Sequence, residues 1–186
     1  MADRLDNPFI ITGKYISGEY FCDREAETGD LVSNIVNWRN TVLVSPRRMG
    51  KTGLIHHTFA QEQIRESYET FFIDIYDTSS LEDFVLLLSK EITSRLQSKG
   101  EKFLARFLSV VSSLRLSVSA DPYTGLPTID IAPGETVTAA TTLEQVFRYL
   151  EASEKPCVVA IDEFQQIADY SDGKKVIATL RKLVQQ

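Results

Sequence analysis

The sequence predicts an α/β fold, a three-layer sandwich with a mostly parallel sheet, and three observations lead to it. A short apolar, β-branched run at residues 41–44 passes through a loop into a helical pattern. A second apolar run, at residues 157–161, is continuous and ends in two acids, as expected of a strand buried on both faces in a parallel sheet. A third strand-like run, at residues 70–76, lies between them among amphipathic helices.

The composition is that of an ordinary globular protein. The chain has 186 residues, 43% of them hydrophobic and 25% charged, which suggests one domain with a sizeable core. The formal net charge of -6 argues against a general basic field for nucleic-acid binding, although local basic patches stay open. No apolar run approaches the roughly 18 residues of a membrane-spanning helix. Cys22 and Cys157 lie far apart without metal-ligand spacing, so we expect a cytoplasmic protein.

The first part of the chain is expected to form an extension and a helix that lead into the core. Residues 1–40 are assigned to an N-terminal extension, in which apolar residues from Leu31 to Trp38 have the spacing of one helix face. Residues 41–186 are assigned to the core itself, starting with the strand at residues 41–44.

The loop after that strand has the pattern of a phosphate-binding loop, also called Walker A. Residues 45–52 fit G-x-x-x-x-G-K-S/T, except that Ser45 replaces the first glycine. In such a loop, backbone N–H groups and the positive end of the following helix bind phosphate oxygens. Lys51 then reaches the β and γ phosphates, and the Thr52 hydroxyl is placed to bind Mg²⁺. The candidate nucleotide-binding residues here are Pro46, Arg47, Arg48, Met49, Gly50, Lys51, Thr52 and Gly53.

The loop alone leaves an alternative open, a basic turn before a surface helix. The acids that follow residues 157–161 favour the phosphate-binding interpretation, because parallel strands present their carboxyl ends at one edge of the sheet. Asp162 is predicted to hold Mg²⁺, through water, and Glu163 to orient and deprotonate the attacking water. The alternative for this pair is that both acids merely begin a helix.

The middle of the chain predicts several further elements. A helix is expected from residue 54 to about 66; it carries His56 and His57, which diverge too far on a helix to share a metal and are expected to be surface or half-buried residues. After the strand at residues 70–76, Asp74 and Asp77 are interpreted as strand-end and turn acids.

Later elements follow from caps and periodicity. The pattern Ser79-x-x-Glu82 predicts a capped helix to about residue 98, and a short helix follows at residues 103–111. Alternating apolar residues predict an inserted β-hairpin at about 113–132. The pattern Thr142-x-x-Gln145 predicts another capped helix, and apolar spacing from Val176 to Leu183 predicts the last one.

These motifs together resemble the archaeal-type ATPase family of the AAA-like and STAND-like P-loop NTPases. The resemblance is carried by Phe21-x-x-Arg24-x-x-Glu27, the Pro-Arg-Arg-x-Gly-Lys-Thr loop and the Walker B strand that ends Ile-Asp-Glu-Phe. It implies that ATP and Mg²⁺ are the cofactors and that Phe21, Arg24 and Glu27 lie near the adenine. An exposed helix start with solvated charges is an equal alternative for those three residues.

The resemblance also implies that the chain is the N-terminal part of an ATPase domain, truncated after the Walker B strand and the following helix. Related chains continue with a sensor strand, an arginine-bearing helix and a further domain. The sensor strand would lie between the strands at residues 41–44 and 157–161. We expect its place to be filled by another segment, by a second chain or by direct pairing of the flanking strands.

The resemblance leaves the partners of the chain open. The hairpin is either a contact for a partner or subunit or, as we favour, a cover for a sheet edge. A protein partner or a C-terminal domain is expected, an oligomer stays open, and nucleic acid enters only through a further domain. No membrane partner is expected.

The predicted function is hydrolysis of ATP to ADP and phosphate with Mg²⁺. The alternative is an ATP-gated interaction switch or scaffold with slow or no hydrolysis. A nucleoside or small-molecule kinase shares the loop, but a substrate hydroxyl as acceptor needs no water-activating Glu163. The choice of ATP over GTP rests on the resemblance.

Overall fold

The computed structural model describes residues 21, 23–46, 48–97, 101–111, 114–120, 127–133 and 138–184, with backbone alone for 114–133. The chain divides into two compact units, Met1–Thr70 and Phe71–Gln186. Each unit is described by itself. Among the described residues, no helix combines the length and the apolar character that crossing a membrane requires.

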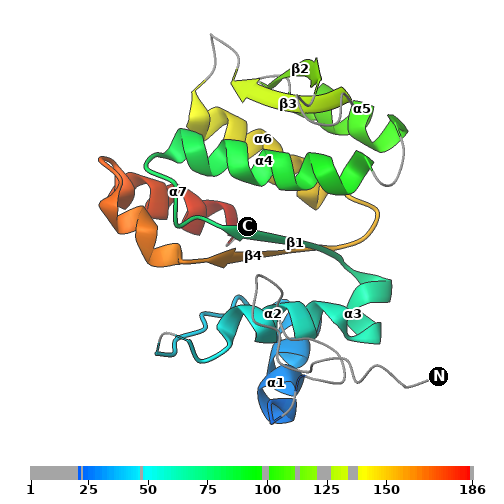
Figure 1. Cartoon of the computed structure of the whole chain (residues 1–186), viewed down its shortest axis with the longest axis vertical. Coiled ribbons are helices and arrows are strands. Elements are labelled where there is room, and N and C mark those ends of the chain that lie inside the picture. Colours follow the sequence, from blue (N-terminus) through cyan, green and yellow to red (C-terminus); the bar gives the residue numbers. More distant parts are fainter. Residues whose placement is uncertain are drawn as a thin grey trace, which may run out of the picture. The chain divides into compact units, whose positions relative to one another are not determined.

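The first unit is helical. It contains α1 (Glu25–Val36), α2 (Lys51–Ala60) and α3 (Glu62–Ser67), and α2 packs against both of the others (Figure 1). Helix α1 begins earlier than the apolar spacing predicts, because Glu25 and Glu27 in its first turn favour a helix N-terminus. The buried side chains of the described part are Thr28, Leu54, Thr58 and Ile64.

The predicted helix from residue 54 to 66 is interrupted at Gln61. This residue has φ −59° and ψ 136°, so the backbone leaves the helical region for one residue between α2 and α3. The Gln61 side chain donates its Nε2 hydrogen to the carbonyl oxygen of His57 at 3.1 Å. That bond satisfies a carbonyl that the interruption would otherwise leave without its helical donor.

The predicted strand at residues 41–44 is wrong for this structure. These residues have no regular secondary structure, and the side chains of Val42 and Val44 are 85% and 89% exposed. A strand needs a neighbouring strand that accepts and donates its backbone hydrogen bonds, and the described part of the chain provides none for this segment. A β-branched composition alone therefore does not make it a strand. In the described part of the chain, residues 41–44 belong to neither two-stranded sheet, and how the sensor-strand place is filled stays a prediction.

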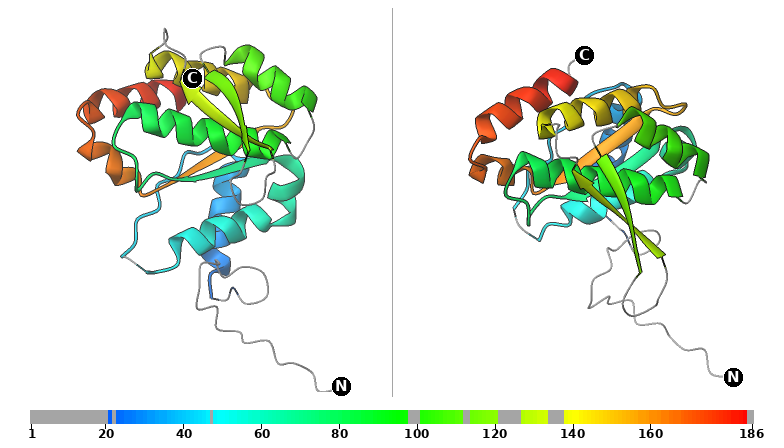
Figure 2. Two further views of the ribbon diagram at one scale, coloured as in Figure 1. Left: turned by 45° about the horizontal axis from the view of Figure 1, so that its top comes forward. Right: turned by 90° about the horizontal axis from the view of Figure 1, so that it is seen from above.

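The second unit has a small parallel sheet covered by helices. Strand β1 (Glu69–Asp74) pairs with β4 (Cys157–Asp162), and β1 begins at the end of the first unit. Helices α4 (Leu81–Gln97), α6 (Ala139–Glu151) and α7 (Gly173–Val184) lie on one side of this pair (Figures 1 and 2). Helix α5 (Glu101–Val110) packs against α4 and α6. The mixture of helices and parallel strands is compatible with the predicted α/β class.

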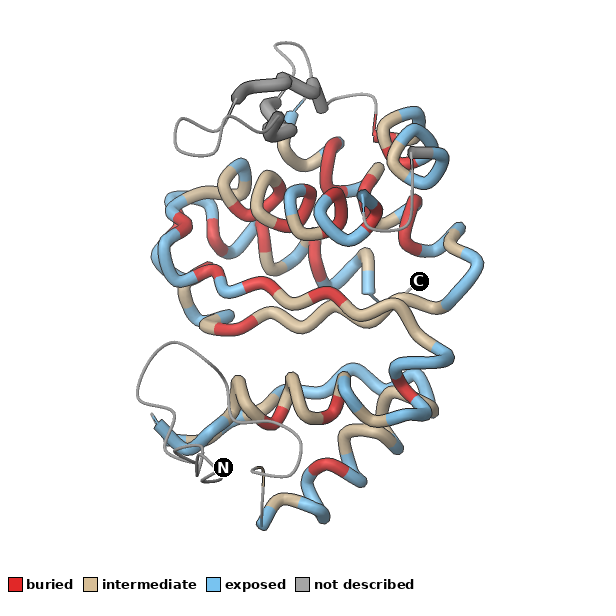
Figure 3. Tube along the Cα trace, turned by 45° about the vertical axis from the view of Figure 1, so that its right-hand side comes forward, coloured by how far each residue is buried: buried red, intermediate tan, exposed pale blue. Residues whose placement is uncertain are grey.

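The core of the second unit lies between the strand pair and these helices. Its buried positions fall on β1 and on the central helices (Figure 3). Phe107 and Tyr149 meet edge to face at its α5 side, with ring centroids 4.9 Å apart. Strand β4 was predicted to be buried on both faces, yet its residues 157–161 are half-buried, and Cys157, Val159 and Ile161 are the ones that pack against the core. The alternation arises because the helices described here cover one face.

The predicted hairpin is confirmed at the level of the backbone. Strands β2 (Leu114–Ala120) and β3 (Pro127–Pro133) pair antiparallel, with Leu116 opposite Ile131 and Val118 opposite Ile129. The sequence alternation is therefore in register across the pair, which places the apolar positions of both strands on the same face. Strand β3 also lies close to α4.

Both predicted helix caps are displaced from their predicted positions. Helix α4 starts at Leu81, and the capping pair is Ser80 with Asp83, since the Asp83 N–H donates to Ser80 Oγ at 3.1 Å. The Asp83 carboxylate accepts from the N–H and the hydroxyl of Ser79, and these bonds lower the pKa of Asp83. Helix α6 is capped by Thr138, while Thr142 is buried inside it. Closely spaced Ser, Thr, Asp and Glu residues offer several equivalent capping patterns, and packing selects among them.

Gly173 allows α7 to pack closely on the preceding 3₁₀ helix η2 (Phe164–Asp169). A Cβ at this position would lie 2.1 Å from the carbonyl oxygen of Ile167, which is backbone and cannot rotate away. The first residue of α7 must therefore be glycine for this contact to exist.

Replacing Gly173 by alanine is expected to lower the free energy of unfolding by about 2 kcal/mol, or roughly 4–8 °C in unfolding midpoint, because the chain must shift to relieve the overlap. Thermal unfolding followed by circular dichroism measures the change. Gly29→Ala is the matched control, since a Cβ there meets nothing within 4 Å, and alanine in a helix interior should be neutral or stabilising. Equal stability of Gly173→Ala and the wild type would contradict the packing argument.

Candidate functional site

The loop before α2 has two residues in the left-handed region. Arg48 has φ 62° and Gly50 has φ 73°, and they flank Met49. A Cβ at Gly50 would meet nothing within 4 Å, so glycine is favoured there by the backbone conformation rather than by lack of space. Such turns direct successive backbone N–H groups to one side, which is the geometry of an anion-binding nest.

Helix α2 begins directly after this turn. Lys51, Thr52 and Gly53 are its first three residues, and the first helical bond runs from the Leu54 N–H to the Gly50 carbonyl at 2.9 Å. Gly50 is the N-cap of this helix and has no side chain that could cap its first turn. The positive end of the helix dipole adds to this site, so it is suited to an anion.

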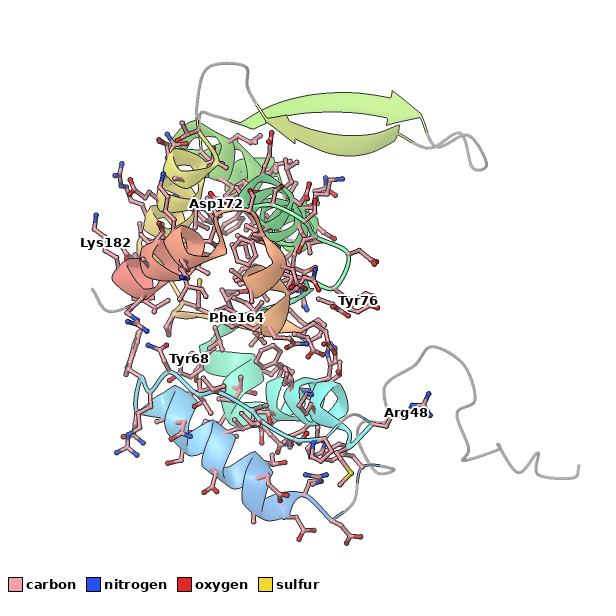
Figure 4. The ribbon with its side chains drawn as sticks, turned by 90° about the vertical axis from the view of Figure 1, so that its left-hand side faces the viewer. Arg48, Tyr68, Tyr76, Phe164, Asp172 and Lys182 are labelled. Carbon is pink, nitrogen blue, oxygen red and sulfur yellow. The ribbon has the colours of Figure 1, made fainter. Side chains whose placement is uncertain are left out.

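The remaining predicted loop residues differ in their surroundings. Pro46 and Arg48 are exposed, and the Arg48 side chain extends away from the loop (Figure 4). Ser45 is half-buried and its hydroxyl donates to the carbonyl oxygen of Pro46 at 3.3 Å. Arg47 lies outside the described residues. The side chains of Lys51 and Thr52 are half-buried at the start of α2.

The predicted adenine-side residues meet other protein groups. Arg24 donates from Nη2 to the carbonyl oxygen of Met49 at 2.8 Å and from Nη1 to Glu27 Oε1 at 3.1 Å. The ring of Phe21 stacks on that of His57, with centroids 4.3 Å apart and planes 18° from parallel. His56 and His57 are both half-buried, as predicted. The spacing of residues in the sequence does not predict that Phe21 contacts His57 or that Arg24 contacts Met49.

The two predicted acids lie at the end of β4. Asp162 is its last residue and is 8% exposed, and Glu163 follows with φ 55°. The Asp162 Oδ1 atom accepts the Glu163 N–H at 3.0 Å, and Glu163 Oε2 accepts a hydrogen from Gln165 Nε2. A left-handed residue other than glycine is uncommon. It turns the chain sharply out of the strand, so the two neighbouring acids have different surroundings, one buried and one half-buried.

The end of β1 lies beside these acids. The Ile75 N–H donates to the Asp162 carbonyl at 3.3 Å, so the carboxyl ends of the two strands are adjacent. Asp74 accepts the N–H of Tyr76 at 3.0 Å, which fits its interpretation as a strand-end acid.

Sequence reasoning missed two aromatic residues at this edge. Tyr76 follows β1 and is 58% exposed, and Phe164 follows Glu163 and is 43% exposed (Figure 4). Tyr76 ends the predicted run at residues 70–76, and Phe164 follows the two acids after the run at residues 157–161. These positions were the available signal, since residues at the ends of neighbouring parallel strands share one edge of the sheet.

A buried hydrogen bond supports the same edge. The hydroxyl groups of Thr78 and Tyr170 lie 2.5 Å apart, and Thr78 also donates to the Ile75 carbonyl. This arrangement ties the turn after β1 to the end of η2. Burial raises the pKa of Tyr170, while its bond to Thr78 acts in the opposite direction. No sequence pattern pairs residues so far apart, so these two positioning residues were not predicted.

The predicted site residues thus form two groups, the loop before α2 in the first unit and the acidic end of β4 in the second. Hydroxyl and carboxylate oxygens, such as those of Thr52 and Asp162, are the ligand types that Mg²⁺ prefers, and Mg²⁺ usually keeps several waters. The donor types therefore fit this metal. Within the described ranges, no three His, Cys, Asp or Glu residues gather into a metal-binding cluster.

Comparison with known proteins identifies a distant relative. The chain is 28% identical over 160 residues to an uncharacterized ATP-binding protein of Methanocaldococcus jannaschii. The match covers 80% of this chain and 44% of that protein, so the chain spans less than half the length of its relative. No family model matches the sequence, and no solved structure matches it.

Proposed function

We propose that the protein binds ATP with Mg²⁺ and hydrolyses it to ADP and phosphate. The observation that carries the proposal is the start of α2, where a left-handed Gly50 leads directly into Lys51, Thr52 and Gly53 in the first helical turn, at the positive end of the helix dipole. The similarity to an ATP-binding protein supports the choice of nucleotide.

Some of these residues bind the nucleotide, and others act in its hydrolysis. The backbone N–H groups at the loop and the Lys51 ammonium hold the phosphates and neutralise charge that develops on them. Thr52 and, through water, Asp162 would hold Mg²⁺, and the bound ion would neutralise charge on the β and γ phosphates. Glu163 accepts a proton from the attacking water, a contribution of roughly 10²- to 10⁴-fold in rate.

The proposal extends to the fold and the family. The chain is then a partial P-loop ATPase core from residue 41 onward, with an inserted hairpin, in the archaeal-type family of AAA-like and STAND-like NTPases. In the complete three-layer fold, residues 41–44 form a strand once a neighbouring strand pairs with them. The exposed valines of that segment agree with a need for such a neighbour.

A second candidate function is an ATP-gated switch with slow or no hydrolysis. The observation that favours it is the division of the site residues between two compact units. Nucleotide binding and slow hydrolysis would then change the surface offered to a partner.

Thermal unfolding with and without Mg-ATP tests the proposal. At 100 times the dissociation constant, binding should add about 2.7 kcal/mol to the free energy of unfolding, or roughly 5–10 °C of midpoint for a two-state chain of this size. Mg-AMP at the same concentration should give a much smaller shift, because it lacks the β and γ phosphates. No shift with either nucleotide would contradict the proposed function.

A further inference from the structure

We propose that Arg24 is a positioning residue for the phosphate loop and makes no contact with the base of the nucleotide. This inference rests on the proposed function, and it replaces the adenine-side role that the family resemblance implies for Arg24. Three features of the described structure carry it: where the guanidinium bonds, what that bond does to the next peptide, and how its charge is balanced.

The guanidinium bonds to the loop backbone rather than facing an open site. Arg24 lies at the N-cap of α1, and its Nη2 donates to the carbonyl oxygen of Met49 at 2.8 Å. Met49 is 25 residues further along the chain and lies directly before Gly50. The bond therefore joins the start of α1 to the last turn of the loop before α2.

The bond orients the peptide group between Met49 and Gly50. No cis peptide bond occurs in the described part of the chain, and in a trans peptide the carbonyl and the N–H point in opposite directions. A carbonyl held by Arg24 thus turns the Gly50 N–H away from Arg24. Because Gly50 has no Cβ and lies in the left-handed region, the backbone on its side of this peptide has few steric restraints, and an external bond is an effective way to fix it.

The second bond of the guanidinium balances its charge. Arg24 Nη1 pairs with Glu27 Oε1 at 3.1 Å, one helical turn away. A planar guanidinium can hold a carbonyl and a carboxylate at once from separate nitrogens, which a lysine ammonium does not reproduce with the same geometry. The pairing leaves Arg24 with little unbalanced charge for the nucleotide, and it suits a residue that acts through the loop.

The test compares two ligands that share the phosphates and differ in the base. Dissociation constants for Mg-ATP and for magnesium tripolyphosphate are measured by competition with a fluorescent ATP analogue. Arg24→Ala should weaken both about ten-fold, the factor expected for loss of one partly exposed, charge-assisted hydrogen bond. Both dissociation constants should increase by the same factor if Arg24 only positions the loop, because the base then makes no contact that the substitution removes.

Two further variants separate positioning from damage to the fold. Arg24→Lys should lose part of the affinity for both ligands, again by equal factors, and it carries the test if Arg24→Ala does not fold. Arg95→Ala is the matched control, since Arg95 pairs with Glu91 on α4 at the same 3.1 Å distance in the other unit. It should leave both dissociation constants unchanged. The midpoint of unfolding without nucleotide should move by only about 2–4 °C in the Arg24 variants.

The outcomes are distinct. If the wild type binds neither ligand, the proposed function fails, and this inference fails with it. If the wild type binds both and Arg24→Ala weakens Mg-ATP alone, Arg24 contacts the base and the positioning role is overturned while the function stands. Unchanged binding of both ligands by Arg24→Ala would also overturn it.

Discussion

Replacing Lys51 by alanine is expected to weaken Mg-ATP binding about 100-fold. The side chain begins α2 beside the N–H groups of the first turn, and a bond between an ammonium and a phosphate is among the stronger polar contacts in proteins. At a concentration 100 times the wild-type dissociation constant, the added stability should then fall from about 2.7 to about 0.4 kcal/mol, which almost removes the shift in unfolding midpoint.

Calorimetric titration gives the dissociation constants directly. Lys182→Ala is the matched control, because Lys182 is an exposed lysine in the last turn of α7, far along the chain from the loop (Figure 4). It should bind Mg-ATP like the wild type. If Lys51→Ala binds Mg-ATP with wild-type affinity, the loop does not hold the phosphates, and its assignment is contradicted.

Replacing Glu163 by glutamine is expected to lower the rate of ATP hydrolysis by roughly 10²- to 10⁴-fold while Mg-ATP binding stays within a few-fold of the wild type. The amide has nearly the same shape as the carboxylate but does not accept the proton of the attacking water. Its oxygen still accepts the hydrogen of Gln165 Nε2, so the turn after β4 keeps that bond. Single-turnover release of labelled phosphate measures the rate even where multiple turnover is slow.

Glu154→Gln is the control for this variant. Glu154 is an exposed acid shortly before β4, so its replacement makes the same change in charge without altering the turn after the strand. Its rate of hydrolysis should be that of the wild type. An unchanged rate for Glu163→Gln would show that Glu163 is not the general base. A wild type that binds Mg-ATP without releasing phosphate would favour the switch over the ATPase.

The helices and the paired strands were largely predictable from sequence. The apolar run at Cys157–Asp162 forms β4, and the alternation before and after the central turn forms the β2–β3 hairpin. Helix α2 was also expected after the loop, and it begins at Lys51, three residues before the predicted start at residue 54. These features depend on periodicity and on turn residues, which are local properties of the chain.

Features that depend on partners distant in sequence were not predictable. The β-branched run at residues 41–44 has the composition of a strand but pairs with no strand among the described residues, and it has no regular structure. The caps of α4 and α6 lie at Ser80 and Thr138, where helix packing selects one of several adequate caps. The bond between Thr78 and Tyr170 joins segments that no spacing rule connects.

By itself, the sequence predicted which residues would carry the chemistry, since Gly50-Lys51-Thr52 and Asp162-Glu163 form patterns of residue type and order. The tertiary structure alone decided how those residues are held. It placed the Arg24 guanidinium on the Met49 carbonyl and turned Glu163 into the left-handed region beside the end of β1. The physical reason is that residue chemistry is a local property, whereas the direction of a peptide or a carboxylate is set by hydrogen bonds to groups that only folding brings near.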